Sequence, residues 1–221
     1  MHTPPLECLY EDEWMIAVNK PAGQLVHPAD HPQPDDIVTM KLVRDYLGTR
    51  VYAAHRLDRP TCGVLIFAKG KTAARALGRA FDRKQVSKIY QAIVTGQPTT
   101  ETWTCCEPLR KDENAPAKEA ITDFRLLKSV GLDLALLEAL PRTGRYHQIR
   151  KHLQICGHPI VGDFRYAGKE FCHAQSEKLG TETRMLLQCK QMELPHPVEN
   201  RALTIKAPID PCFEKLLKSH K

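Results

Sequence analysis

The sequence lacks several features that would each define a class of protein. No apolar run approaches the roughly 20 residues that a membrane-spanning helix needs. The first residues contain neither a basic segment nor an apolar one, so export by a signal peptide is not expected. None of the eight cysteines forms a C-x-x-C pair, and we expect them to be free thiols. These absences predict a cytoplasmic protein that makes no contact with a membrane.

Signatures of metal and nucleotide binding are also missing. His147 and His152 are five residues apart, whereas the zinc-binding H-E-x-x-H pattern places its histidines four apart. The run Gly70-Lys71-Thr72 is similar to the end of a phosphate-binding loop, but Leu65 stands where that loop requires glycine. We therefore expect no metal site and no cofactor.

The composition is that of an ordinary globular protein. Hydrophobic residues make up 42% and charged residues 26% of the 221 residues. This length suits one large domain or two small ones, and no repeat or long linker divides the chain. Lys and Arg number 32 against 26 Asp and Glu, a formal net charge of +6. That charge is compatible with a nucleic-acid partner without requiring one.

Short β-prone segments predominate along the chain, and a few amphipathic segments lie between them. Recurring hairpin connections indicate an α+β fold rather than a doubly wound one. Residues 99–117 are polar and contain proline, which predicts a loop or a hairpin. We expect strands at 6–10, 15–18, 63–68, 87–95, 121–127, 132–140, 186–194 and 202–207, and helices at 38–47, 71–84, 146–156 and 212–218.

The segment His55-Arg56-Leu57-Asp58-Arg59-Pro60-Thr61-Cys62-Gly63 carries the most chemical information. It places Asp58 beside two arginines, in a loop that leads into a buried strand. Neighbouring cations lower the pKa of a carboxyl group and favour its charged form. Loops at strand ends are where a scaffold presents reactive groups. A reactive carboxylate and a surface turn held by salt bridges explain these residues equally well.

Six motifs in the same order resemble those of the RluA-type RNA pseudouridine synthases. The loop His-Arg-Leu-Asp-x-x-Thr-x-Gly is one of them, and the others extend the resemblance over nearly the whole chain. The opening residues 9–14 and the form Arg59-Pro60-Thr61 most resemble the TruC subgroup, which modifies the tRNA uridine conventionally numbered 65. The remaining motifs are Asn19–Gly23, Lys88–Gly96, Thr143–Leu153, Gly157–Tyr166 and Arg184–Pro197.

The resemblance implies a role for each residue of a catalytic set. Asp58 matches the catalytic aspartate, and whether it adds to the uracil or removes a ribose proton stays open. Arg150 matches an arginine that pairs with this carboxylate, and Tyr90 a tyrosine that stacks on the uracil. Leu187 and Ile149 are implied to form an apolar floor for the base. Taken without the family, Tyr90 and Leu187 would be interpreted as core residues.

The resemblance also implies contacts with RNA. A uridine in a stem must leave the stack to be reached, and Arg56 matches an arginine that fills the vacated space. Tyr146 stands where the family usually has a small hydroxyl residue, so its bulk is expected to alter RNA contact. Any one of the other charged residues could equally be a solvated surface charge. The further candidates for RNA binding are Lys20, Arg59, Arg142, Arg145, His147 and Lys151.

We expect a single catalytic domain over residues 1–221, without an N-terminal S4 domain and acting as a monomer. Its expected architecture is a mixed, mostly antiparallel sheet flanked by helices, with a central RNA-binding cleft. The expected activity is isomerisation of uridine to pseudouridine, with tRNA as substrate and ribosomal RNA as the alternative. A non-catalytic RNA-binding module with the same fold is the alternative of a different class.

Overall fold

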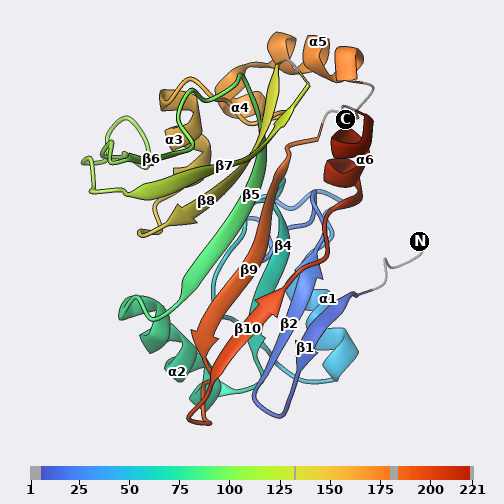
Figure 1. Ribbon diagram of the computed structural model, residues 1–221. Helices are drawn as coiled ribbons and strands as arrows, with labels where there is room; N and C mark the ends of the chain where they lie inside the picture. Colours follow the sequence, from blue (N-terminus) through green and yellow to red (C-terminus); the bar gives the residue numbers. More distant parts are fainter. Residues whose placement is uncertain (1–5, 132, 180–183, 220–221) are drawn as a thin grey trace. The chain divides into compact units, whose positions relative to one another are not determined.

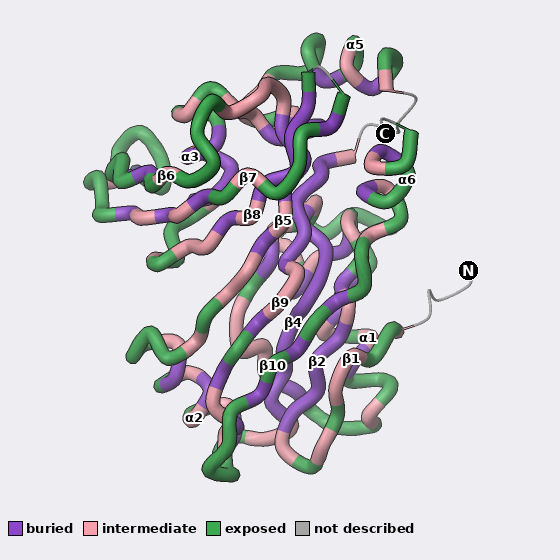
Figure 2. Tube along the Cα trace, in the orientation of Figure 1, coloured by how far each residue is buried: buried purple, intermediate pink, exposed green. Residues whose placement is uncertain are grey.

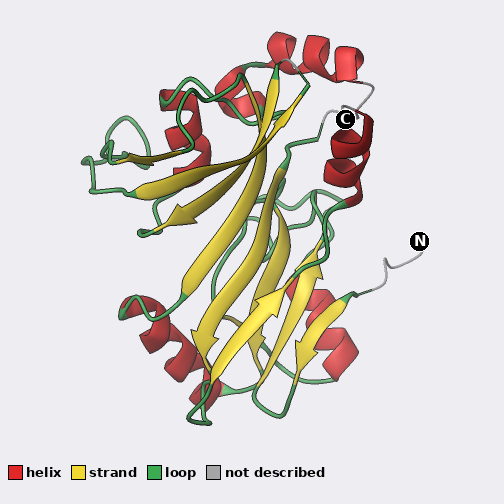
Figure 3. Ribbon diagram, in the orientation of Figure 1, coloured by secondary structure: helices red, strands yellow, loops and turns green. Residues whose placement is uncertain are grey.

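The computed structural model describes residues 6–131, 133–179 and 184–219, so Leu132, the first residue of one predicted strand, lies outside the described residues. The chain has the predicted α+β fold, with a mostly antiparallel sheet flanked by helices (Figures 1 and 3). It divides into two compact units. Unit 1 comprises the described residues within 1–87 and 189–208, and unit 2 those within 88–188 and 209–221. In these ranges no helix is long and apolar enough to cross a bilayer.

Unit 1 is built on antiparallel strand pairs. The pairs β1–β2, β2–β4 and β9–β10 are antiparallel, β3 adds a short antiparallel pairing to β4, and β9 lies next to β4. Its strands are β1 (Cys8–Glu11), β2 (Met15–Lys20), β3 (Tyr52–Ala53), β4 (Cys62–Ala68), β9 (Leu187–Pro195, of which the first two residues belong to unit 2) and β10 (Ala202–Lys206).

Continuous apolar sequence explains the centre of unit 1. All seven residues of β4 are buried, as are Met15–Val18 of β2 (Figure 2). Strands that are covered on both faces have such unbroken apolar runs. Helix α2 (Lys71–Asp82) packs against β4 and buries Ala73, Leu77 and Ala80, which share one helix face. Helix α1 (Thr39–Leu47) ends at Gly48, whose left-handed backbone favours glycine.

Unit 2 combines a second antiparallel group of strands with four helices. The strand order is β5-β8-β7-β6, and every neighbouring pair is antiparallel. Helix α3 packs against β7 and β8, and α4 contacts both α3 and α5 (Figure 1). The elements are β5 (Ser87–Thr95), β6 (Thr102–Cys105), β7 (Thr122–Val130), β8 (Leu134–Pro141), α3 (Gln148–Ile155), α4 (Phe164–Ala167), α5 (Lys169–Leu179) and α6 (Pro211–Ser219).

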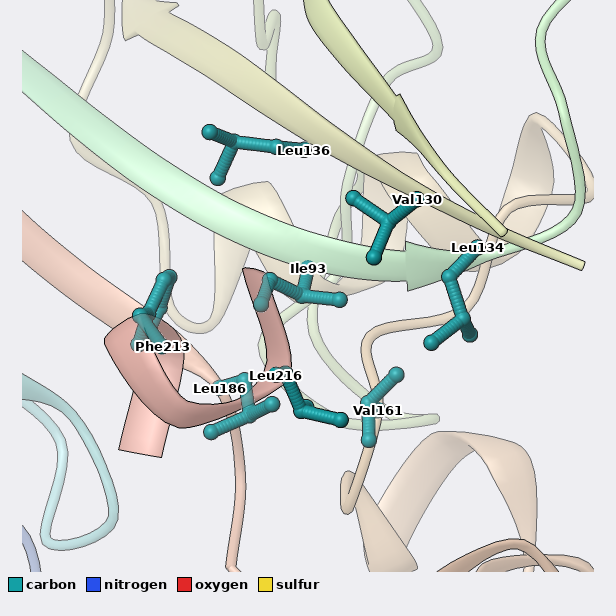
Figure 4. Close-up of a cluster of buried hydrophobic side chains, with 8 residues drawn as sticks. All are labelled: Ile93, Val130, Leu134, Leu136, Val161, Leu186, Phe213 and Leu216. Atoms are coloured by element: carbon teal, nitrogen blue, oxygen red, sulfur yellow. The ribbon is translucent and has the colours of Figure 1, made fainter. Parts of the chain in front are cut away.

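The core of unit 2 joins segments that lie far apart in the sequence. The backbone of Ile93 accepts a hydrogen bond from the amide of Val161 at 3.0 Å and donates one to Leu186 at 3.1 Å. Two side chains of α6, Phe213 and Leu216, complete the cluster and are almost fully buried (Figure 4). The predicted C-terminal helix is therefore part of the core. The cluster consists of Ile93, Val130, Leu134, Leu136, Val161, Leu186, Phe213 and Leu216.

The structure departs from the predicted elements at three helices, since α3 begins later than predicted and neither α4 nor α5 was predicted. Helix α3 begins at Gln148 rather than at Tyr146, because His147 has a left-handed backbone with φ 55°. Helix α5 was not predicted, and it buries only Cys172 and Ser176. Its mostly polar sequence has no apolar stripe to indicate a helix. Strand β6 lies in the segment for which a loop or hairpin is expected.

Gly63 is required by the approach of two strands in unit 1. Its φ of 107° disfavours other residues, and a Cβ there would lie 2.2 Å from the carbonyl oxygen of Cys189. We predict that Gly63→Ala lowers the free energy of unfolding by at least ~2 kcal/mol. Gly78 of α2 has open space around it, so Gly78→Ala should instead raise that free energy by about 0.5–1 kcal/mol. Urea unfolding measures the free energy of unfolding of both variants, and equal changes would contradict the role assigned to Gly63.

Candidate active site

The loop that carries Asp58 is fixed at both ends in unit 1. Asp58 itself is half-buried, and its carbonyl oxygen accepts a hydrogen bond from the amide of Thr61 at 3.0 Å, which closes a tight turn. Leu57 and Thr61 on either side are buried. At the start of the loop, His55 accepts a hydrogen bond from the amide of Ile66 at 3.2 Å. The backbone at Asp58 is therefore held in one conformation.

Lys20 belongs to the scaffold of this loop, and its predicted role as a phosphate contact is wrong. The residue is fully buried, and its ammonium donates to the carbonyl oxygens of Pro21 and Gln24 at 2.8 Å each and of Arg59 at 3.2 Å. A buried charge is tolerated only when such partners replace water. Lys20 therefore ties the segment after β2 to the loop that carries Asp58.

The two arginines beside Asp58 differ in their surroundings. Arg59 donates through Nε to the carbonyl oxygen of Gly23 at 3.0 Å, and its Nη1 lies 3.0 Å from Oδ1 of Asp36. Arg56 is exposed, and among the described residues none forms a hydrogen bond or an ion pair with its side chain. The positive charge of Arg56 reaches His27, whose pKa is lowered first by burial and further by this charge. Arg59 thus holds the loop together, while Arg56 is available to a ligand.

A buried ion pair organises the candidate site residues of unit 2. Arg150 of α3 donates through Nε and Nη2 to the two carboxylate oxygens of Asp163, at 2.8 and 2.7 Å. Both side chains are almost completely buried. A bidentate pair of this kind fixes the guanidinium plane. Arg150 also lies over the ring of Tyr166, with Cζ 5.1 Å from the ring centroid. Neither Asp163 nor Tyr166 was assigned a role from the sequence beyond membership of the motif Gly157–Tyr166.

Arg150 determines the protonation of His147. Its Nη1 lies 3.3 Å from Nε2 of His147, and because a guanidinium only donates, Nε2 must be the acceptor. The imidazole proton then sits on Nδ1, which lies 2.9 Å from the hydroxyl of Tyr166 and donates to it. Burial raises the pKa of Tyr166, so the phenol stays protonated. His147 is thus a neutral imidazole held in a left-handed backbone at the start of α3.

A second buried network fixes the loop before α3. The side-chain oxygen of Gln148 accepts from Thr143 at 2.7 Å and from the amide of Arg145 at 2.9 Å. Its nitrogen donates to the hydroxyl of Thr122, also at 2.9 Å. Thr122 in turn donates to Nδ1 of His152 at 2.9 Å, because Nε2 of that histidine donates to the carbonyl oxygen of Glu107 at 3.0 Å. Every buried polar group of this network has a partner.

The predicted apolar residues of the site lie in unit 2 and are buried. Tyr90 is in β5 opposite Ala139 of β8, Ile149 is in the first turn of α3, and Leu187 is the first residue of β9. Their exposed fractions are 9%, 7% and 3%. Unit 2 thus contains Tyr90, Arg150 and Leu187, whereas Asp58 belongs to unit 1. The pairing of Asp58 with Arg150 stays a prediction.

The predicted RNA-binding cations near α3 lie at the surface of unit 2. Arg142 forms an exposed ion pair with Asp123. Arg145 is exposed and donates through Nε to the carbonyl oxygen of Glu119 at 2.8 Å. The ammonium of Lys151 donates to the carbonyl oxygen of Arg110, and burial, followed by the charge of Arg165, lowers the pKa of Lys151.

The described residues contain no cluster of three or more His, Cys, Asp or Glu side chains that could hold a metal ion. Each of the eight cysteines is a free thiol. Unit 1 therefore presents the carboxylate of Asp58, and unit 2 by itself presents the guanidinium of Arg150 with the imidazole of His147 and the phenol of Tyr166. Such groups suit charge stabilisation and proton transfer.

Comparison with known proteins points to one family. The family model described as RNA pseudouridylate synthase matches residues 14–155. A protein of Salmonella typhi named tRNA pseudouridine synthase C is 35% identical over 96% of this chain and 88% of its own length. One of the same name from Pasteurella multocida (strain Pm70) is 36% identical over 93% and 92%. The solved structure of human RNA pseudouridylate synthase domain containing 4 has a TM-score of 0.79 at 26% identity, covering 96% of this chain and 92% of that one.

Removal of Asp163 should destabilise the protein strongly. Asp163→Asn removes the negative charge that Nε and Nη2 of the buried Arg150 guanidinium contact, and we predict a loss of about 3–5 kcal/mol in the free energy of unfolding. The control is Asp133→Asn, which breaks an exposed pair with Lys178 whose side chains are 65% and 69% exposed. That change should cost less than ~1 kcal/mol. Urea unfolding compares the two variants, and similar losses would contradict the assigned role of Asp163.

Stability should fall in mild acid because of His152. Burial lowers the pKa of this imidazole below its ordinary value of 6.5. Below that pH the unfolded chain binds a proton that the folded chain does not, so the free energy of unfolding decreases as the pH falls. Unfolding measured between about pH 7.5 and 5.5 should show a smaller decrease in His152→Gln than in wild type. His173 is exposed, and His173→Gln should behave as wild type. An unchanged slope in His152→Gln would refute the assignment.

Proposed function

Because the chain belongs to the RNA pseudouridylate synthase family, we propose that it isomerises uridine to pseudouridine in tRNA, with Asp58 as its catalytic carboxylate. The choice of tRNA rests on the relatives named tRNA pseudouridine synthase C. They are 34–36% identical to this chain over more than nine-tenths of its length. Ribosomal RNA is the alternative substrate, and release of tritium from each RNA distinguishes the two.

The reaction is an isomerisation that needs no oxidant, reductant or group donor. The bond between ribose C1′ and uracil N1 breaks, the base rotates, and a bond forms between C1′ and C5. The hydrogen at C5 leaves as a proton, and N1 gains one. The protein must therefore hold the base while it is detached, stabilise charge on ribose or base, and move a proton.

We assign the charge-bearing steps to Asp58 and Arg150. The turn from Asp58 to Thr61 and the buried flanking residues support a carboxylate held in one place. The fixed guanidinium of Arg150 supports its role as the partner of that carboxylate, because its plane is set by Asp163 before substrate arrives. Such a partner keeps the carboxylate charged and oriented.

We assign the binding of the base to the buried residues of unit 2. In this proposal Tyr90 stacks on the uracil, and Leu187 and Ile149 provide its apolar floor. A stem uridine reaches this set only after leaving the stack. The exposed and uncommitted side chain of Arg56 supports its assignment to the space that the uridine vacates.

The remaining cations are proposed to position the RNA. Phosphate contacts fix the register of an RNA without reading its sequence. Arg145 and Lys151 at the surface of unit 2 suit this role, and Arg59 is a weaker candidate because its guanidinium is engaged with Gly23 and Asp36. The cytoplasmic location, the monomeric state and the central RNA-binding cleft stay predictions.

The test uses tRNA labelled with tritium at uridine C5, because isomerisation releases that label. We expect release by the wild-type chain and a reduction of at least ~10³-fold in Asp58→Asn, with tRNA binding retained. Asp35 is an exposed carboxylate in the same unit, and Asp35→Asn is the matched control with wild-type rate.

Two outcomes would overturn the proposal. Release of label from ribosomal RNA but not from tRNA would refute the assigned substrate. Equal rates for Asp58→Asn and wild type would refute the assigned carboxylate.

A further inference from the structure

Tyr146 is an exposed aromatic residue beside the buried part of the site. It lies just before α3, where the left-handed backbone of His147 carries it out of the helix that the sequence predicts for it. Its exposed fraction is 41%. The ring stacks on the imidazole of His147, with 3.7 Å between centroids and 20° between planes. A single exposed aromatic residue is ordinary in itself, so the groups around this ring decide what it can bind.

Cations surround this ring. The ammonium of Lys151 lies 5.6 Å and the guanidinium carbon of Arg165 5.8 Å from its centroid. Arg165 also approaches the hydroxyl of Tyr146 at 3.4 Å. The neighbouring residue Arg145 is exposed, and so is Arg110, whose carbonyl oxygen binds Lys151.

These cations are not neutralised by carboxylates. The negative charge of Asp112 acts to raise the pKa of Lys151, against the lowering caused by burial and by Arg165. Nevertheless, in the part of the chain that the structure describes, no carboxylate lies within ion-pairing distance of Arg145, Lys151 or Arg165. By contrast, Arg142, which directly precedes the motif Thr143–Leu153, forms an ion pair with Asp123. Lys151 and Arg165 beside the ring, and Arg145 next to Tyr146 in the sequence, thus offer positive charge to a ligand.

We propose that Tyr146, with Arg145, Lys151 and Arg165, binds an unpaired nucleotide of the RNA other than the uridine that is isomerised. The base stacks on the tyrosine ring and its phosphates lie among the three cations. Aromatic side chains beside cationic groups are the usual means of binding single-stranded nucleic acid. The identification of the ligand as RNA rests on the proposed function.

The position of this platform explains what it would contribute. Tyr146 stacks on His147, and His147 contacts Arg150. One residue, His147, therefore links the tyrosine ring to the buried guanidinium. A nucleotide bound there would anchor the RNA next to the site without touching the reacting base. Loss of the Tyr146 ring should therefore weaken RNA binding.

The experiment measures the affinity of the full chain for tRNA, for a short single-stranded RNA, and for the same RNA annealed to its complement. Tyr146→Ser should weaken binding of tRNA and of the single strand by roughly 5- to 100-fold, and Tyr146→Phe should bind as wild type. Binding of the duplex should not change, because its bases are not free to stack. The control is Tyr46→Ser, since Tyr46 is 60% exposed and its hydroxyl approaches Glu11 rather than cations.

A second measurement tests the cations. Arg165→Gln should reduce the slope of log affinity against log salt by about 1, whereas Lys128→Gln, at an exposed site of β7, should leave it unchanged.

The proposal is overturned if Tyr146→Ser binds the single strand as wild type does, or if it weakens duplex binding equally. It is also overturned if Arg165→Gln leaves the salt slope unchanged. Because affinity is measured without turnover, a wild-type chain that binds but releases no tritium would refute the proposed function alone.

Discussion

The buried pair of Arg150 and Asp163 is the constraint on which the candidate site of unit 2 depends. Two opposite charges that are almost wholly removed from water must be joined in good geometry, and both oxygens of Asp163 meet the guanidinium. Asp163 has little freedom of its own. It follows Gly162, whose φ is 75° and where a Cβ would lie 2.1 Å from the carbonyl oxygen of Arg184.

Several other features follow from this pair. With the guanidinium fixed, Nε2 of His147 must accept from it, and the imidazole proton must face the hydroxyl of Tyr166. His147 stands at the end of this chain of contacts, and its backbone is left-handed. Tyr146 therefore lies outside α3, at the surface. The buried ion pair thus sets the tautomer of His147, whose ring in turn stacks on that of Tyr146.

The sequence predicted the fold well where burial is continuous and poorly where it is not. Strands β2, β4 and β5 and helix α2 were predicted closely, because their apolar residues follow one period. Helix α5 escaped prediction because it buries only two side chains. The motif residues of the site were found by resemblance, yet the burial of Lys20 and the contact of Asp163 with Arg150 were not. Both depend on contacts between distant segments, which local sequence does not record.

A map of pseudouridines in total cellular RNA shows whether this chain converts a uridine of tRNA into pseudouridine. The map is made from cells that carry the gene and from cells that lack it. We expect one tRNA pseudouridine to disappear when the gene is absent and to return when it is restored. Identical maps, or a loss confined to ribosomal RNA, would contradict this expectation.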